Sequence, residues 1–245
     1  MKESLNKSQI ERFSRQLVLK NIGAKGQKKI LSSKILIVGV GGLGCPAAEN
    51  LVRAGIGNIG LIDNDIVNLS NIHRQSLFTS KDIKKSKVSV AAKKLKEINP
   101  STKIKIYKSR LDRSNIKNII KNYEIIIDGS DNFKTKFLIN DYCKKLKKKL
   151  VTGAISKFDG HVFTFDFNDR KTASLKSFYQ ENEISDDDLN CEFEGVLGTT
   201  ASIVGTTQAN EALKMIVKIG QNLKNQILII DLLNLNFRKV KFNKK

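Results

Sequence analysis

The chain has 245 residues, of which 40% are hydrophobic and 28% are charged. This apolar content is enough for a packed core, so a disordered or fibrous chain is excluded. No apolar stretch approaches the ~20 residues of a membrane-spanning helix, and the first residues lack a secretory apolar region. We therefore expect a soluble, cytoplasmic protein with no membrane partner.

The charge is strongly positive, with 44 Lys and Arg against 24 Asp and Glu and a formal net charge of +20. Such an excess is typical of proteins with anionic partners such as nucleic acids, nucleotides or acidic proteins. The chain also has 2 Pro and no Trp, alongside many Lys, Asn and Ile residues. This pattern favours a genome-wide compositional bias as the main source of the charge, so nucleic acid is not the expected partner.

Strands and helices alternate along the first two thirds of the chain. The sequence predicts a helix at 8–19 that opens with a Ser8–Glu11 capping box. The predicted elements that follow are a strand at 35–38, a helix at 45–55, a strand at 58–67, a helix at 82–99, a strand at 103–110, a helix at 114–123, a strand and acidic turn at 124–132, a Lys-rich helix to about 148 and a strand at 150–155. This order predicts an α/β fold with a Rossmann-like, doubly wound and mostly parallel sheet.

The pattern changes after Gly160. Residues 161–167 alternate like an antiparallel strand, and 168–190 are polar and predicted to form a mobile surface loop. A helix rich in small residues is expected within 195–220, followed by strands at 227–236 and 237–242. We therefore expect a single domain over 1–245, with a nucleotide-binding part at 1–155 and an antiparallel C-terminal extension at 156–245.

A glycine pattern stands between the first strand and the helix that follows it. Gly39, Gly41 and Gly44 fit G-x-G-x-x-G, which allows a tight turn, close approach of phosphate and packing of helix on strand. Phosphate then lies at a helix N-terminus, where free N–H groups favour negative charge. Asp63 follows at the end of the second strand, where a carboxylate can bind ribose hydroxyls. The pattern predicts nucleotide binding and leaves a dinucleotide and ATP both open.

The charged residues around this crevice favour ATP. Asp63, Asp65, Asp128 and Asp131 all follow strand ends, where ligands bind in such sheets. Arg and Lys side chains beside a lone carboxylate suit a triphosphate and Mg²⁺ better than a nicotinamide.

At this level the chain resembles the E1-like adenylyltransferases, which activate ubiquitin-like sulfur carriers for molybdopterin synthase and thiamine biosynthesis. The matching stretches run in order over nearly the whole chain: ERFSRQLVL, KILIVGVGGLGCPAAENLVRAGIGNIGLIDND, VNLSNIHRQSLF, KKSKV, DGSDN, LVTGA and CEFEGVLGTTASIVGTTQANEALK.

The resemblance implies that the C-terminal glycine carboxylate of a small Gly-Gly-ended carrier attacks the α-phosphate of MgATP, releasing pyrophosphate. It also implies a homodimer, with residues 156–245 serving the carrier and the dimer. The implied roles are nucleotide binding by Gly42 and its neighbours, ribose binding by Asp63 with Asp65 in support, phosphate stabilisation by Arg74 and Lys87 with Asn71 and Gln75 in support, Mg²⁺ binding by Asp131, and a contribution of Arg15 to the other subunit's active site.

The cysteines depart from the family pattern. Cys45, Cys143 and Cys191 form an odd set without a CxxC pair, whereas many bacterial relatives carry two such pairs that bind a structural zinc. No zinc is expected here. Cys191 matches a cysteine that links to the carrier or handles sulfur in some branches, so it is a candidate catalytic residue, although Glu192 and Glu194 disfavour its thiolate. Sulfur passes either through this chain or through a separate sulfurtransferase.

Three other functions remain open from the sequence. The glycine pattern by itself also fits an NAD-dependent oxidoreductase. A related branch activates a tRNA-modification carboxylate on the same fold. The +20 charge and missing zinc cysteines would also fit an inactive basic scaffold. The two histidines, His73 and His161, are expected to be non-catalytic.

Overall fold

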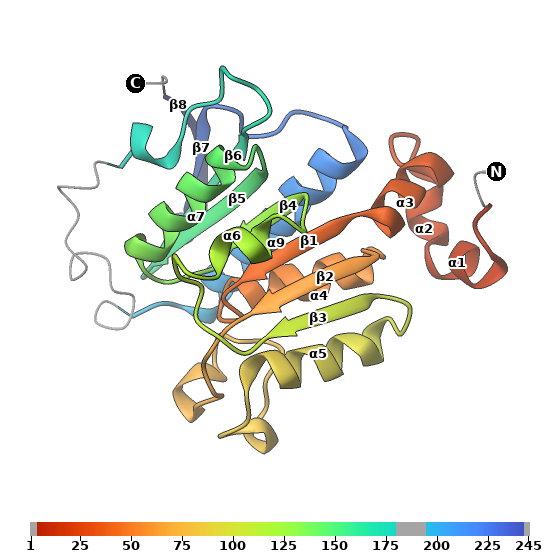
Figure 1. Cartoon of the computed structure of the whole chain (residues 1–245), viewed down its shortest axis with the longest axis horizontal. Helices are drawn as coiled ribbons and strands as arrows, with labels where there is room; N and C mark the ends of the chain where they lie inside the picture. The colour runs from red at the N-terminus through yellow and green to blue at the C-terminus, as the bar shows by residue number, and fades with distance from the viewer. Residues whose placement is uncertain (1–3, 180–194, 243–245) are drawn as a thin grey trace.

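The structure is a computed structural model that describes residues 4–179 and 195–242. Within these residues, eight strands form one sheet of order β3-β2-β1-β4-β5-β6-β7-β8 (Figure 1). The strands are β1 (Lys34–Val38), β2 (Asn58–Ile62), β3 (Lys103–Tyr107), β4 (Ile125–Asp128), β5 (Lys149–Ser156), β6 (Asp159–Asp166), β7 (Gln226–Asp231) and β8 (Asn236–Lys241).

The sheet has a parallel part and an antiparallel part. Strands β3, β2, β1, β4 and β5 pair in parallel, whereas β5, β6, β7 and β8 pair antiparallel. The predicted Rossmann-like, mostly parallel sheet with an antiparallel C-terminal extension is therefore confirmed.

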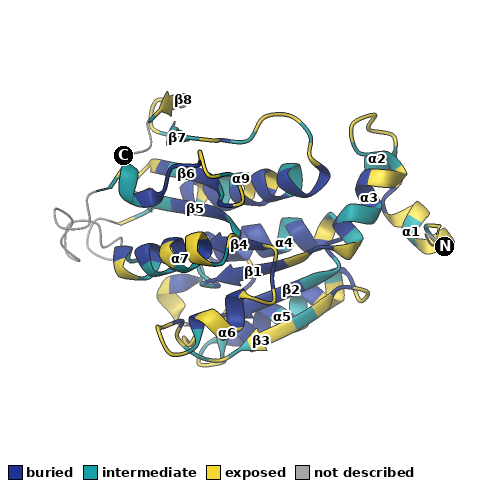
Figure 2. Ribbon diagram, turned by 45° about the horizontal axis from the view of Figure 1, so that its top comes forward, coloured by how far each residue is buried: buried dark blue, intermediate teal, exposed yellow. Residues whose placement is uncertain are grey.

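Helices cover both faces of this sheet (Figures 1 and 2). Residues of α4, α5 and α9 share one hydrophobic core, and residues of α6 and α7 share the other. The helical elements are α1 (Lys7–Arg12), α2 (Ser14–Leu17), α3 (Gly23–Ser32), α4 (Gly44–Arg53), η1 (Leu69–Asn71), η2 (Ser80–Asp82), α5 (Lys87–Ile98), α6 (Ile116–Ile120), α7 (Phe133–Lys145), η3 (Leu175–Ser177) and α9 (Gly198–Val217). Among the described helices, none is both long and apolar enough to cross a membrane.

The central strand β1 shows why its run of apolar residues is uninterrupted. Ile35 and Ile37 lie in the core under α4, α5 and α9, whereas Leu36 and Val38 lie in the core under α6 and α7. Side chains alternate between the faces of a strand, so a strand covered on both sides must be apolar at every position. Figure 2 shows this central layer buried on both sides.

Small residues bring α9 close to the start of α4. A Cβ added to Gly205 would lie 2.3 Å from the Leu43 carbonyl oxygen, so only glycine allows this approach. Ala209 and Ala212 are also buried on α9. The helix rich in small residues expected within 195–220 is thus present as α9, and its small residues allow close packing.

The N-terminal helix differs from the prediction. Asn6, not Ser8, caps α1, and its capping-box partner is Gln9, not Glu11. The helical segment is divided at Phe13, the residue between α1 and α2 in sequence, whose buried ring lies against Gly55. The predicted capping box at Ser8 and Glu11 was therefore wrong by two residues. Asn6, which is also of a type preferred at the N-cap, precedes Ser8 and takes this position.

Two predictions for the C-terminal third also need correction. Residues 168–179 were predicted to lie in a mobile surface loop, but residues 172–175 are buried. The Leu175 amide also donates to Asn140 Oδ1 at 3.0 Å. The remainder of the predicted mobile loop, 180–190, lies outside the described residues. The strand predicted at 227–236 ends at Asp231, where a turn begins, and Leu233 and Leu235 in that turn are exposed.

Candidate active site

A cavity of about 490 Å³ opens at the carboxyl edge of the parallel strands. The strand order reverses between β1 and β4, and ligands of doubly wound sheets bind at such a switch point. Ten of the predicted site residues line this cavity: Gly39, Gly41, Gly42, Asp63, Asp65, Asn71, Arg74, Gln75, Lys87 and Asp131.

Three predicted site residues do not line it. Gly44, the first residue of α4, is not part of the cavity lining. Arg15 is exposed on α2 and does not reach the cavity of its own chain. Cys191 lies outside the described residues. Cys45 and Cys143 are buried, and burial raises the pKa of the Cys45 thiol to about 12, as expected for packing residues.

The glycine loop turns sharply between β1 and α4. Gly39 has a φ of +83°, which residues with a side chain rarely adopt. A Cβ at this position would also lie 2.9 Å from the Gly129 carbonyl oxygen. A Cβ on Gly44 would lie 1.9 Å from the Gly39 carbonyl oxygen, so the helix can start here only with glycine. These two constraints place Gly41 and Gly42 at the cavity wall, next to the first turn of α4.

Asp63 ties the glycine loop to the turn after β2. Its Oδ2 accepts the Val40 amide at 2.7 Å, and its Oδ1 accepts the Asp65 amide at 2.8 Å. Burial raises the pKa of Asp63, while these amide bonds and nearby Lys87 act in the opposite direction. Each carboxylate oxygen keeps a lone pair for a further donor, such as a ligand hydroxyl.

Lys87 is a buried cation at the cavity wall. Its ammonium group donates to Asp65 Oδ2 at 2.9 Å, and the side chain is 7% exposed against 55% for Asp65. The backbone supports the same contact, because the Lys87 amide donates to the Asp65 carbonyl at 3.0 Å. The exposed Asp65 carboxylate therefore orients the buried ammonium group of Lys87.

A second carboxylate, which sequence reasoning missed, anchors the loop before Lys87. Asp82 accepts hydrogen bonds from the Lys94 ammonium at 2.6 Å and from the Thr79 hydroxyl at 2.8 Å. Burial opposes ionisation, but these bonds outweigh it and lower the pKa of Asp82 to about 2. Asp82 was not identified because its partner Lys94 comes from the next helix, and nothing local in the sequence marks the pair.

The turn at 68–75 carries Arg74 and Gln75 into the cavity. Asn71 closes η1, with its Oδ1 accepting the Asn68 amide at 3.2 Å. The Arg74 guanidinium donates to the Ser70 carbonyl at 2.9 Å and also contacts His73 Nε2 at 2.8 Å. Gln75 is buried, and its Oε1 atom has no hydrogen-bond partner among the described residues.

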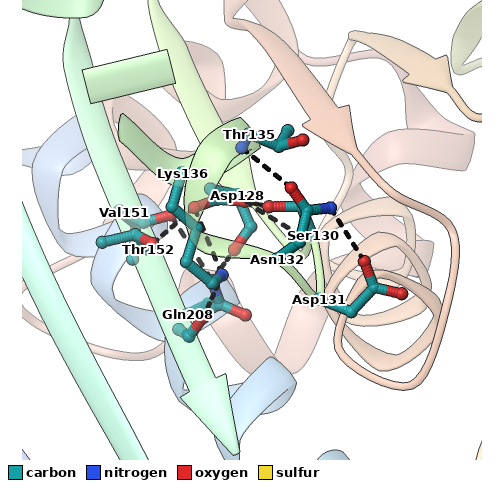
Figure 3. A network of polar contacts seen from close by, with 10 residues as sticks. Asp128, Ser130, Asp131, Asn132, Thr135, Lys136, Val151, Thr152 and Gln208 are labelled. Carbon is teal, nitrogen blue, oxygen red and sulfur yellow. Dashed lines mark hydrogen bonds and ion pairs between the residues drawn. The ribbon is translucent and has the colours of Figure 1, made fainter. Parts of the chain in front are cut away.

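A buried ion pair supports the loop between β4 and α7 (Figure 3). Asp128 is fully buried and accepts Lys136 Nζ at 3.4 Å and the Thr152 hydroxyl at 2.6 Å through Oδ2. Its Oδ1 accepts both the amide and the hydroxyl of Ser130, at 2.9 and 2.6 Å. Lys136 also donates to the Gly153 carbonyl at 2.6 Å. The network thus joins β4, β5 and α7, and through Ser130 it reaches the residue before Asp131.

Asp131 is exposed beside this network. Its Oδ1 accepts Asn132 Nδ2 at 3.1 Å, while Asn132 Oδ1 caps α7 by accepting the Thr135 amide at 2.9 Å (Figure 3). Nowhere in the described part of the chain do three His, Cys, Asp or Glu side chains gather in a metal-binding arrangement. A cation at Asp131 would need further oxygen ligands from a bound substrate or water.

The other end of the cavity was not predicted. It is formed by β5, β6 and the segments near them, and the residues are Ala154, Ile155, Ser156, Asp159, His161, Tyr179 and Val196. His161 Nδ1 lies 3.0 Å from the Tyr179 hydroxyl. Burial lowers the pKa of His161, against a smaller opposing effect of Asp159. His161 is therefore a wall residue of the cavity, which no motif in the sequence indicates.

Comparison with known proteins gives a consistent result. The ThiF family model matches residues 13–245. A probable molybdopterin-synthase adenylyltransferase of Porphyra purpurea is 42% identical over 94% of this chain and 60% of its own length. A sulfur carrier protein adenylyltransferase of Thermus thermophilus is 36% identical over 96% of this chain and 88% of its own length.

Longer relatives and solved structures agree with this. An adenylyltransferase and sulfurtransferase MOCS3 of Drosophila virilis is 40% identical over 99% of this chain, which spans 53% of that relative. The chain spans between about half and two thirds of the first three curated relatives. The crystal structure of E. coli MccB with ATP has a TM-score of 0.82 at 21% identity and covers 96% of this chain and 72% of its own, which shows a shared fold. On the family match and the identity of its relatives, the chain belongs to the ThiF family.

Proposed function

We propose that this protein uses ATP to adenylate the C-terminal glycine of a small ubiquitin-like sulfur-carrier protein, releasing pyrophosphate. The observation that carries this proposal is the convergence of the glycine loop, Arg74, Lys87 and Asp131 on one cavity. The names of the relatives, molybdopterin-synthase adenylyltransferase and sulfur carrier protein adenylyltransferase, support the same activity. The carriers of molybdopterin and thiamine biosynthesis are the substrates to test.

The residues present fit ATP. A Cβ on Gly41 would face the cavity with only Gln75 Nε2 within contact distance, at 3.6 Å, so the glycine leaves space for a ligand atom. The unpartnered Gln75 Oε1 leaves one buried acceptor for a ligand or its water. Asp63 has lone pairs for the ribose hydroxyls.

Arg74 and Lys87 would neutralise the phosphates. The reaction brings an anionic carboxylate against an anionic phosphate, so it needs positive charge and in-line alignment more than proton transfer. A carboxylate oxygen of the carrier forms a bond to the α-phosphorus, and the bond from that phosphorus to the bridging oxygen of pyrophosphate breaks. Lys87 is suited to this task because Asp65 and the backbone hold its ammonium group in place.

Asp131 would bind Mg²⁺ together with phosphate oxygens. Mg²⁺ commonly uses one or two protein carboxylates and completes its shell with substrate and water, so one exposed aspartate is sufficient. The bound ion would lower the repulsion between substrate charges. The network around Asp128 and Lys136 keeps the Asp131 loop in position.

Three further parts of the proposal concern partners. Arg15 is exposed and remote from its own cavity, which is compatible with a homodimer in which it enters the other subunit's active site. Residues 1–155 would bind the nucleotide, and 156–245 would bind the carrier and the second subunit. Cys191 would act in sulfur handling, unless a separate sulfurtransferase supplies that step.

Pyrophosphate–ATP exchange tests this function directly. The protein is incubated with ATP, Mg²⁺, labelled pyrophosphate and a Gly-Gly-ended carrier from the molybdopterin or thiamine pathway, and label should appear in ATP. Exchange should require the carrier and should vanish when its terminal glycine is deleted. Absence of exchange with both carriers, or carrier-independent exchange, contradicts the proposal. Calorimetry with NAD serves as the control for the oxidoreductase alternative, and no binding is expected.

A further inference from the structure

A buried glutamine of α9 binds the end of strand β4. Gln208 is fully buried, and its Nε2 donates to the Asp128 carbonyl at 2.7 Å and to the Val151 carbonyl at 3.4 Å (Figure 3). Both partners are acceptors, so the amide nitrogen, and not the amide oxygen, has to face them. Through this one side chain, α9 is joined to the last residue of β4 and to the neighbouring strand β5.

The peptide group held in this way is the point at which the chain leaves the sheet. It joins Asp128 to Gly129, and the Gly129 amide on its other side donates to the Val38 carbonyl of β1 at 2.9 Å. The next residue, Ser130, bonds the Asp128 carboxylate through both its amide and its hydroxyl. The direction in which the chain continues to Asp131 therefore depends on how this peptide group is held.

The backbone of β5 is shaped to admit the glutamine. A Cβ added to Gly153 would lie 2.9 Å from Gln208 Cδ and 3.1 Å from both its Nε2 and its Oε1. The amide group of Gln208 therefore occupies the space that a side chain at Gly153 would need. Any residue larger than glycine at this position would displace the donor from the Asp128 carbonyl.

The same helix contacts the glycine end of the cavity, where the glycine loop and Arg74 lie. A Cβ added to Gly198, the first residue of α9, would lie 2.5 Å from the His73 carbonyl oxygen, so the helix closely approaches the turn that carries Arg74. Ala201 Cβ would lie 3.2 Å from a Cβ added to Gly42 in the glycine loop. Since α9 is one helix of 20 residues, it holds these two loops and the end of β4 at fixed separations.

From these contacts we infer that Gln208 is a positioning residue: by holding the Asp128–Gly129 peptide group, it sets where Asp131 lies relative to Arg74. The inference rests on the proposed function in one respect, because Asp131 matters there as the residue that would bind Mg²⁺. The contact between α9 and β4 does not depend on that function, so it can be tested without a ligand.

Amide hydrogen exchange in the ligand-free protein tests the positioning itself. Gln208→Met keeps the size of the side chain and removes the donor, so the amides of residues 129–132 should exchange about three- to tenfold faster, the effect of one lost hydrogen bond. Gly153→Ala displaces the same donor from the β5 side. Because its methyl group meets only the far end of a side chain, this variant should fold and should speed exchange at the same residues.

The matched control is Gln27→Met. Gln27 is also fully buried, its Nε2 donates to a backbone carbonyl, that of Ala54, at 2.9 Å, and its Oε1 lacks a partner among the described residues, as Gln208 Oε1 does. It does not line the cavity. The same chemical change is thus made elsewhere in the core, and exchange at 129–132 should stay at the wild-type rate.

The Mg²⁺ concentration that gives half-maximal pyrophosphate exchange provides the second readout. It should rise by about three- to tenfold in Gln208→Met and Gly153→Ala, while the KM for the carrier stays within about twofold and Gln27→Met behaves as wild type.

Wild-type amide exchange at 129–132 in both Gln208→Met and Gly153→Ala, or equally fast exchange in Gln27→Met, would show that Gln208 does not hold this loop. A loosened loop with an unchanged Mg²⁺ requirement would refute the positioning of Asp131 and leave the proposed function standing. A wild type without pyrophosphate exchange overturns that function and, with it, the role of Gln208 toward Mg²⁺.

Discussion

The two ends of the cavity differ in charge and in how they are held. At the glycine end, Lys87 is paired with Asp65 and Arg74 lies on a turn closed by Asn71, so the cations are fixed by short-range contacts. At the β5–β6 end, His161 and Tyr179 form a neutral pair that packed aromatic rings hold in place. Between the ends lies the buried network of Asp128 and Lys136 (Figure 3).

This difference indicates two ligands of different chemistry. A polyanion needs fixed positive charge, which Arg74 and Lys87 supply at the glycine end. The β5–β6 end offers instead the neutral hydrogen-bonding pair of His161 and Tyr179. Under the proposed function, the phosphate donor would bind at the glycine end and the acceptor would meet it near Asp131.

The largest expected effect is the loss of the metal ligand. Asp131→Ala should lower pyrophosphate exchange by roughly 100- to 1,000-fold, the loss expected when a group that stabilises transition-state charge is removed. Because Asp131 is exposed, the thermal unfolding midpoint should not change. Asp141→Ala is the control, since that carboxylate pairs with Lys176 away from the cavity. Normal exchange in Asp131→Ala would exclude a catalytic metal at this position.

The network between the two ends should be needed for stability. Lys136→Met leaves the fully buried Asp128 without its cation and the Gly153 carbonyl without its donor. Removing one partner of a buried ion pair costs about 3–5 kcal/mol, so urea unfolding should show a loss of this size. Arg53→Met is the control, because its ion pair with Glu49 is on the surface and should matter by less than about 1 kcal/mol. An unchanged unfolding free energy in Lys136→Met would show that the pair contributes nothing.

Glycine substitutions can separate binding from folding at the glycine end. Gly41→Ala adds a methyl group that meets only Gln75 Nε2, at 3.6 Å, so the protein should fold and the KM for ATP should rise by about tenfold, an energy of about 1.4 kcal/mol. Gly44→Ala would place the same group 1.9 Å from a carbonyl oxygen and should instead prevent folding. A rise in the carrier KM with Gly41→Ala would contradict the division between the two ends.

The smallest effect concerns the loop that precedes Lys87. The pKa of Asp82 is about 2 in the folded protein against an ordinary value of 3.8, so its ionised form stabilises the fold above about pH 4. This contribution is lost as the pH falls from about 4 to about 2. Asp82→Asn should cost roughly 1–2 kcal/mol at pH 7, and the difference from wild type should shrink across that window in unfolding measurements. A constant difference from pH 7 to pH 2 would show that ionisation of Asp82 is not the cause.

The sequence allowed the glycine end to be predicted because its signals are local. Gly39 and Gly44 lie within one turn, and Asp63 follows at a fixed distance after the next strand. The β5–β6 end depends on which strand pairs with which. His161 and Tyr179 are 18 residues apart in the sequence, and residues 172–175 in the segment between them are buried. Because the residues around 172–175 are polar, this segment was predicted to be a surface loop. Asp82 and Asp128 were likewise missed as anchors, since their partners Lys94 and Thr152 come from other elements.

A crystal structure with a non-hydrolysable ATP analogue and Mg²⁺ tests the central claim most directly. The account predicts the triphosphate beside Gly41 and Gly42 within hydrogen-bond distance of Arg74 and Lys87, with the ribose at Asp63 and the ion at Asp131. His161 and Tyr179 should remain free of the nucleotide. A nucleotide bound at the β5–β6 end, or with its phosphates out of reach of both cations, would contradict the account.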